Sequence, residues 1–104
     1  MKVRMALDIN VTMGGVSHKF TGLRGYLPRG TDYRDIVRVF GKPQFGESPD
    51  GKIKAEWVGK INGIVFTIYD YNSVVKPKDN TNWHIGGRVE MVVDLVTAYL
   101  RAFR

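Results

Sequence analysis

Apolar and polar residues alternate along the first part of the chain. Between Val3 and Met13 every second side chain is apolar. A period of two predicts a strand over residues 2–13 with one buried face. Gly14-Gly15 follows it and can adopt the positive φ angles of a tight turn, so we expect a hairpin with a second strand over residues 16–27.

A helical pattern begins after the break at Pro28-Arg29-Gly30. Thr31 is placed to cap a helix, and Asp32 and Asp35 lie where the helix dipole favours acidic residues. The apolar positions share one face: Tyr33, Ile36, Val37 and Phe40. We therefore predict a helix that packs on a sheet and ends at Gly41.

The clearest local signal is Asn62-Gly63 between two strand-like segments, residues 52–61 and 64–71. Asn-Gly favours a two-residue turn, which fixes the register of the hairpin. One face then pairs apolar residues: Ile61 with Ile64, Gly59 with Phe66, and Trp57 with Ile68. The other face pairs Val58 with Thr67, Glu56 with Tyr69, and Lys54 with Tyr71. Two tyrosines beside a lysine are an unusual combination for the face away from the core.

The last third predicts a polar loop over residues 72–82, a short strand over 83–85, Gly86-Gly87, and a helix over 88–103. The helix has a core stripe: Val89, Val92, Val93, Val96, Leu100 and Phe103. A second apolar line runs beside it: Met91, Leu95, Ala98 and Ala102. Because a small domain can hardly bury both lines, we expect a homo-oligomer formed through this helix.

These elements predict an α+β fold, a small antiparallel sheet of two hairpins packed against two helices, in a single domain over residues 1–104. A chain that is 43% hydrophobic and 25% charged is typical of a globular protein and not of a disordered one. The absence of cysteine excludes disulfides and thiolate metal sites and fits a cytoplasmic protein. Charges interrupt the first thirteen residues, so we expect neither a signal peptide nor a membrane span.

The chain carries 16 basic and 10 acidic residues, a net charge of +6. This balance favours an anionic partner, such as a nucleotide or a nucleic acid. Its two histidines, His18 and His84, form no metal-binding spacing, and no nucleophile elbow, phosphate loop or dinucleotide motif is present. We therefore expect a binding protein without cofactor or metal, and not an enzyme. A nucleotide hydrolase remains open if carboxylates converge on His84 in space.

Candidate binding residues gather between Tyr69 and Arg88. Tyrosine rings such as Tyr69 and Tyr71 stack on nucleobases, and Asn82 can bond a base or a ribose. Trp83 and His84 follow, and each has a structural alternative, a core anchor for Trp83 and a solvated or satisfied ring for His84.

Gly86 and Gly87 leave backbone N–H groups uncovered before the expected helix, where the dipole favours an anion. Arg88 adds a guanidinium that can bond a phosphate. The alternative is that the glycines form only a turn and a cap.

Arg24 stands on the apolar side of the second expected strand, facing Met5 in the hairpin register. Because an unpaired buried guanidinium is costly, three alternatives remain: a bulge turns it outward, it pairs with an acid, or it holds an anionic ligand.

Several blocks occur in this order in short bacteriophage proteins: Gly25-Tyr26-Leu27, Phe40-Gly41-Lys42-Pro43, Asp50-Gly51-Lys52, Glu56-Trp57, Thr67-Ile68-Tyr69-Asp70-Tyr71 and Trp83-His84-Ile85-Gly86-Gly87. They cover residues 17–96. In size and layout the chain resembles the Thoeris anti-defence sponge family of bacteriophages. Such proteins form oligomers of small antiparallel sheets with two helices. They sequester cyclic ADP-ribose-type immune signals, and some also trap cyclic oligonucleotides of CBASS defence.

This resemblance implies a pocket shared between protomers. Tyr69 or Tyr71 would stack on the ligand, Asn82 would bond its sugar or base, and Arg24 and Arg88 would hold its phosphates. The expected function is a phage sponge that binds its signal without turnover. The alternative is a small basic module that binds nucleic acid or a host protein.

Overall fold

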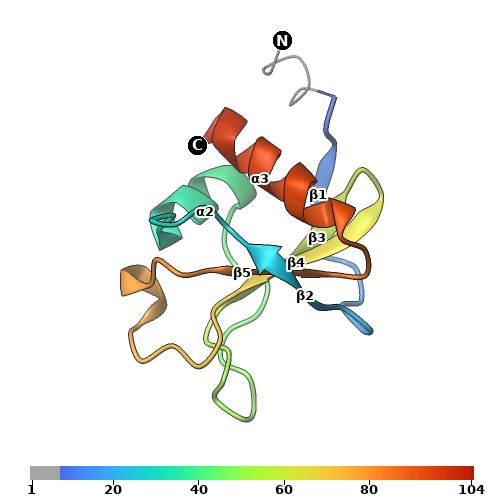
Figure 1. Ribbon diagram of the computed structural model, residues 1–104. Coiled ribbons are helices and arrows are strands. Elements are labelled where there is room, and N and C mark those ends of the chain that lie inside the picture. The colour runs from blue at the N-terminus through green and yellow to red at the C-terminus, as the bar shows by residue number, and fades with distance from the viewer. Residues whose placement is uncertain (1–7) are drawn as a thin grey trace.

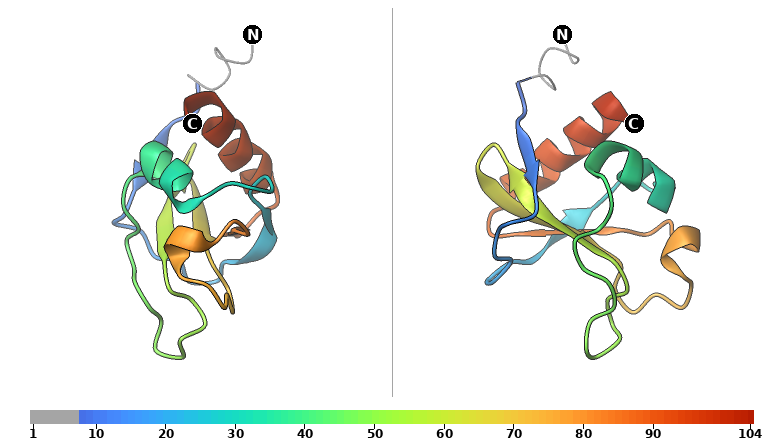
Figure 2. Two further views of the ribbon diagram at one scale, coloured as in Figure 1. Left: turned by 90° about the vertical axis from the view of Figure 1, so that its left-hand side faces the viewer. Right: turned by 180° about the vertical axis from the view of Figure 1, so that it is seen from behind.

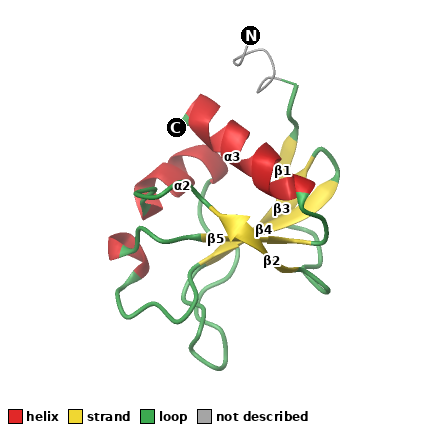
Figure 3. Cartoon of the chain, in the orientation of Figure 1, coloured by secondary structure: helices red, strands yellow, loops and turns green. Residues whose placement is uncertain are grey.

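The computed structural model describes residues 8–104, which form a five-stranded sheet and two α-helices (Figures 1 and 3). The elements are β1 (Val11–Met13), β2 (Gly22–Tyr26), α2 (Tyr33–Phe40), β3 (Glu56–Ile61), β4 (Ile64–Tyr69), a short 3-10 helix η1 (Pro77–Asp79), β5 (His84–Gly87) and α3 (Met91–Phe103). The α+β class is confirmed.

The strands lie in the order β1-β3-β4-β5-β2, and every neighbouring pair is antiparallel. Both helices cover the same face of this sheet (Figure 2). No helix of residues 8–104 lies on the other face, and we call it the open face. Side chains from β2, β3, β4 and β5 lie next to one another on this face.

The core lies between the helices and the sheet. Its side chains come from both layers: Leu27, Ile36, Phe40, Ala55, Trp57, Ile61, Phe66, Ile68, Trp83, Ile85, Val92, Val96 and Leu100. The two tryptophans meet edge to face with ring centroids 5.4 Å apart. The Trp57 indole N–H donates to the carbonyl of Gly41, and that of Trp83 to the carbonyl of Asn80, so both indoles are satisfied structural anchors.

The hairpin at Asn62-Gly63 is confirmed. Both turn residues have positive φ, 50° and 79°, as a type I′ turn requires. The register is the predicted one, with Ile61 opposite Ile64, Trp57 opposite Ile68, and Glu56 opposite Tyr69.

The hairpin expected at Gly14-Gly15 is wrong. Both glycines do have positive φ, 74° and 67°, but β1 pairs with β3 at one edge of the sheet and β2 pairs with β5 at the other. The start of the strand expected over residues 2–13, with Met5, lies outside the described residues. The two glycines therefore begin a crossing segment instead of a tight turn, because long-range pairing with β3 and β5 outweighs the local turn signal.

Helix α2 is confirmed, with Ile36 and Phe40 buried on its apolar face. Its N-cap, however, is Asp32 and not Thr31. Asp32 and Asp35 form a capping box, in which each side chain accepts a hydrogen bond from the backbone N–H of the other. Thr31 is buried and donates from its hydroxyl to the carbonyl of Pro28.

Helix α3 buries Val92, Val96 and Leu100, three members of the expected core stripe. Val89 precedes the helix and is exposed, as is Phe103 at its end. Along the second apolar line, Leu95 is half-buried, whereas Met91, Ala98 and Ala102 are exposed. Among residues 8–104, no helix has both the length and the apolar character needed to cross a membrane.

Candidate ligand pocket on the open face

A row of four polar and aromatic residues crosses the open face. The register places Glu56 of β3 opposite Tyr69 of β4, Tyr69 opposite His84 of β5, and His84 opposite Tyr26 of β2. Since residues directly opposite in an antiparallel sheet are within contact distance, four distant segments of the chain meet here.

Three tyrosines surround His84. The ring of Tyr69 stacks on the imidazole with centroids 5.2 Å apart, Tyr26 lies at 4.9 Å, and Tyr71 meets the imidazole edge on at 6.2 Å. Burial lowers the pKa of His84, with the Tyr69 backbone and the Asp70 carboxylate acting in the opposite direction. Its Nδ1 is buried and has no hydrogen-bond partner within residues 8–104. The surroundings of the imidazole at the centre of this aromatic cluster therefore disfavour its charged form.

A pocket of about 230 Å³ opens beside this cluster. Its lining comes from β2, β3, β4 and β5 and from the segments next to them: Thr21, Gly22, Ile53, Glu56, Thr67, Tyr69, Tyr71 and Gly86. Gly86 is required here, because a Cβ at this position would collide with the Thr67 hydroxyl and lie 3.2 Å from the Tyr69 ring. The missing side chain at Gly86 thus leaves the space that the Thr67 hydroxyl and the Tyr69 ring need.

Glu56 forms one wall of the pocket and pairs with His18. The Glu56 Oε1 lies 3.3 Å from the His18 Nδ1, and the Glu56 side chain is only 13% exposed. Burial raises the pKa of Glu56 and the neighbouring His18 partly opposes the rise. On its other side the His18 ring stacks on Phe45. Burial, followed by the charge of Glu56, also raises the pKa of Tyr69, which therefore keeps its hydroxyl proton at neutral pH.

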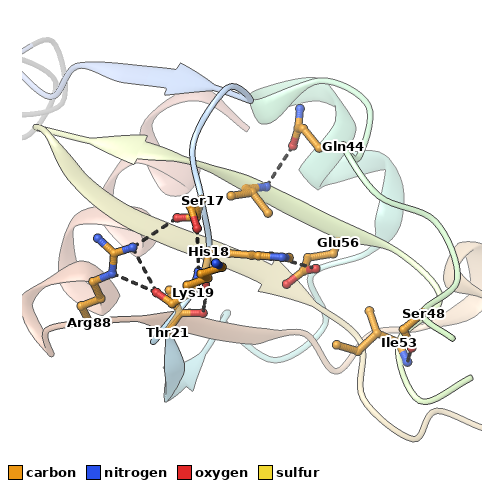
Figure 4. A network of polar contacts seen from close by, with 10 residues as sticks. Ser17, His18, Lys19, Thr21, Gln44, Ser48, Ile53, Glu56 and Arg88 are labelled. Carbon is orange, nitrogen blue, oxygen red and sulfur yellow. Dashed lines mark hydrogen bonds and ion pairs between the residues drawn. The ribbon is translucent and has the colours of Figure 1, made fainter. Parts of the chain in front are cut away.

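Residues 14–21 cross the open face from β1 to β2, and we call them the strap (Figures 2 and 4). Arg88 holds the strap from the sheet, because its Nε and Nη2 donate to the carbonyl of Lys19 and its Nη2 also to that of Ser17. The Thr21 hydroxyl donates to the carbonyl of His18 over 2.7 Å. The strap therefore brings His18 to Glu56 and forms one border of the pocket.

Neither arginine of the expected phosphate site points freely into this pocket. Arg24 sits at an irregularity between Leu23 and Gly25, where the register of β2 shifts. Its guanidinium donates to the carbonyls of Gly87 and Arg88 over 3.0 Å each and lies 4.0 Å from the Glu90 carboxylate. Of the three alternatives for Arg24, a bulge and an acidic partner are both observed.

Arg88 is likewise occupied by the backbone carbonyls of the strap. Both arginines brace the region between β2, β5 and the strap. Holding phosphates in addition would require an exchange of these hydrogen bonds.

The placement expected for Gly86-Gly87, with uncovered N–H groups directly before a helix, is wrong. Both glycines belong to β5 and are paired with β4 on one side and β2 on the other, so they do not precede a helix N-terminus. Helix α3 begins only at Met91. Gly87 faces the core, where a Cβ would lie 2.8 Å from Val92. Close approach, and not a turn, explains this pair of glycines.

The structure thus brings together Tyr69, Tyr71, His84 and Gly86 of the expected site. Trp83 lies on the core side and is 1% exposed, so it braces the fold and does not line the pocket. Asn82 is exposed and borders a second pocket of about 620 Å³ with Tyr26, Leu27, Arg29 and Thr81.

Sequence reasoning missed Glu56, His18 and Thr67 as site residues. The register predicted for the second hairpin already placed Glu56 beside Tyr69 and Thr67 on the same face. His18 could not be found in this way, because its position depends on the strap, which the wrong first hairpin concealed.

Within residues 8–104, no group of three or more potential ligands could hold a metal ion. Comparisons with known proteins give no match at a significant level to a family model, a curated protein or a solved structure.

Proposed function

We propose that the protein binds a small anionic nucleotide-type ligand on the open face of its sheet and holds it without turnover. The observation that carries this proposal is the pocket in which Tyr69 and Tyr71 stand beside Glu56 and Thr67. Aromatic rings stack on nucleobases, each stacked base contributing about 1–3 kcal/mol to binding. Hydroxyl and carboxylate groups in the same pocket supply hydrogen bonds that orient the base.

Charge supports an anionic ligand over a neutral one. The net charge of +6 attracts anions at long range. Exposed Lys19 is next in sequence to His18, which contacts Glu56, and exposed Lys52 is next to Ile53, which lines the pocket. Phosphates would lie toward these lysines and away from the Glu56 carboxylate. In this proposal Arg24 and Arg88 brace the site or contribute after their carbonyl bonds have exchanged.

The biological role we propose is that of a bacteriophage anti-defence sponge. It would sequester a cyclic nucleotide or cyclic ADP-ribose-type immune signal in the host cytoplasm. Binding without turnover predicts that a signal incubated with the protein is recovered unchanged after heat release, as chromatography with mass detection would show. Conversion of the ligand would instead establish an enzyme.

A thermal-shift screen tests the binding proposal. Probes are cyclic di-GMP, cyclic GMP–AMP, cyclic trinucleotides and glycocyclic ADP-ribose isomers. A ligand at a hundred times its dissociation constant adds about 2.7 kcal/mol to the free energy of unfolding. Tyr69→Leu should reduce this ligand-induced shift, whereas Tyr99→Leu, on the helical side of the sheet, should keep it. The absence of a shift with every probe would overturn the proposal.

A second function, binding of single-stranded nucleic acid, is favoured by one observation. Tyr26 of β2 is 52% exposed and Tyr71, just beyond the end of β4, is 45% exposed, and platforms on which successive bases stack also present aromatic rings at a sheet surface. Fluorescence anisotropy with short DNA and RNA oligonucleotides tests it. Binding that weakens steeply with added salt would support this function, and no binding at low salt would exclude it.

We also propose self-association through α3, where Met91 is 60% exposed and Ala98 and Ala102 lie on the surface. An oligomer would bury this line and could bring a second protomer to the ligand. Light scattering after size-exclusion chromatography measures the oligomeric state. Ala98→Glu should yield monomers, and a monomeric wild-type protein would contradict this part of the proposal.

A further inference from the structure

The pocket contains one charged group. Among the described residues that line it, Glu56 alone carries a charge, and the other polar side chains are hydroxyls. An ionised carboxylate only accepts hydrogen bonds, whereas hydroxyls donate or accept as needed. The chemistry of Glu56 therefore decides which ligand edge fits.

Resting on the proposed function, we infer that Glu56 selects a base whose edge presents two adjacent donors, as guanine does with N1–H and its 2-amino group. The two oxygens of a carboxylate can accept both donors side by side. The corresponding edge of adenine presents one donor next to the N1 lone pair, which would face a carboxylate oxygen. Adenine-type bases therefore bind less well.

Geometry places Glu56 correctly for this role. It lies directly opposite Tyr69 in the β3–β4 register, so a base stacked on the Tyr69 ring has its edge beside the carboxylate. The other face of Tyr69 is already covered by His84. His18 contacts Oε1, and within residues 8–104 no hydrogen bond occupies Oε2. One carboxylate oxygen is thus open to the ligand, and the second is shared with a histidine that can yield it.

Burial strengthens the selection. With a side chain 13% exposed, Glu56 is poorly solvated in the empty pocket. Two donors from a ligand would replace the missing water, while a lone pair in their place would leave the carboxylate unsatisfied. A site built to bond a donor discriminates strongly against a ligand that lacks it.

The size of the pocket sets the part of the ligand that enters. A cavity of about 230 Å³ is smaller than the ~300 Å³ at which typical drug-sized sites begin. It fits one base and leaves the sugar and phosphates outside. Among the proposed signals, a guanine-containing cyclic nucleotide is therefore preferred over an ADP-ribose-type signal, whose base is adenine.

Isothermal titration of the full chain with GMP, IMP and AMP tests this inference. GMP should bind at least about 10-fold more tightly than AMP, the difference expected for a hydrogen bond to a charged group. IMP keeps N1–H but lacks the 2-amino group and should fall between them. Glu56→Gln offers one donor and one acceptor, and should bring the GMP and AMP affinities together. Glu47→Gln, an exposed carboxylate away from the pocket lining, is the matched control and should retain the preference.

The outcomes separate the two proposals. Equal binding of GMP and AMP, both weakened by Tyr69→Leu, would overturn the role of Glu56 while keeping the nucleotide pocket. Binding of neither mononucleotide nor any cyclic probe by the folded chain would overturn both. If Glu56→Gln does not fold, Glu56→Asp can replace it. This change shortens the reach of the carboxylate and should weaken the binding of GMP more than the binding of AMP. An equal loss for both would count against the inference.

Discussion

The imidazole of His84 stacks on the phenol ring of Tyr69, with ring centroids 5.2 Å apart and planes 23° from parallel. The two residues are cross-strand neighbours in the middle of the open face. Tyr26 lies against the imidazole as well, at 4.9 Å. A titratable ring is thus held among aromatic rings, where its charged form is poorly solvated, and this makes folding sensitive to pH.

Acidification should destabilise the fold through His84. Burial lowers its pKa in the folded state, so the unfolded chain binds the proton more readily. The stabilisation from neutral His84 is complete above the ordinary histidine pKa of about 6.5 and is lost as pH falls through the lower folded value. Urea unfolding at about pH 8 and about pH 5 should therefore show a larger loss of stability for the wild type than for His84→Phe. Arg101→Ala, at an exposed position of α3, is the control and should keep the wild-type difference. Equal losses for the wild type and His84→Phe would contradict this assignment.

Gly86→Ala should destabilise the protein by about 1–3 kcal/mol, the usual range for an overpacked interior. The added Cβ would collide with the Thr67 hydroxyl and approach the Tyr69 ring to 3.2 Å and the carbonyl of Gly22 to 3.3 Å. Chemical unfolding measures the loss. Gly22→Ala is the matched control, because a Cβ there meets nothing within 4 Å, and it should change stability much less. Thr67→Ala in the Gly86→Ala background removes the colliding atom and should recover part of the loss; no recovery would indicate that backbone strain dominates.

Turn chemistry made one half of the candidate site predictable. Asn62-Gly63 allows essentially one register for β3 and β4, and the alternation of side chains then puts Glu56, Thr67 and Tyr69 on one face. These positions are set by contacts within one hairpin, so the local sequence pattern is enough to predict them.

The other half depends on contacts that no local pattern records. Gly14-Gly15 has the conformation of a turn, but the partners of β1 and β2 are set by the exposed edges of β3 and β5. In the sequence, Gly86-Gly87 is equally consistent with a turn and with two strand positions that have no space for a side chain. The packing of Thr67 against Gly86 and of Val92 against Gly87 shows that the second explanation holds. The course of the strap, and with it the position of His18, depends on these long-range contacts.

Arg88→Ala should loosen the strap without unfolding the domain. The guanidinium donates three hydrogen bonds to the carbonyls of Ser17 and Lys19, in an exposed setting where the net loss should be about 1 kcal/mol. Cleavage after Lys19 by a lysine-specific protease should become faster, since that bond lies in the strap. Arg88→Lys should resemble Arg88→Ala because an ammonium cannot reproduce the fork of the guanidinium. The Arg101→Ala variant, changed at an exposed position of α3, should be cleaved as slowly as the wild type. Unchanged cleavage in Arg88→Ala would show that the strap is held by other contacts.

Phe20, at the end of the strap, combines a positive φ of 64° with a side chain that is 90% exposed. A bulky residue rarely adopts this conformation, and such strain is often found at functional sites. Asparagine tolerates the same φ, and the exposed ring contributes little burial, so Phe20→Asn should stabilise the fold by about 0.5–1 kcal/mol. Urea unfolding measures the change. Phe45→Asn, in which φ is not positive and the ring that stacks on His18 is lost, should be destabilising and serves as the contrast. If Phe20→Asn instead lowers stability, the Phe20 ring makes contacts in solution that offset the strain. If it raises stability but weakens the binding of a nucleotide, the strained ring belongs to the ligand site.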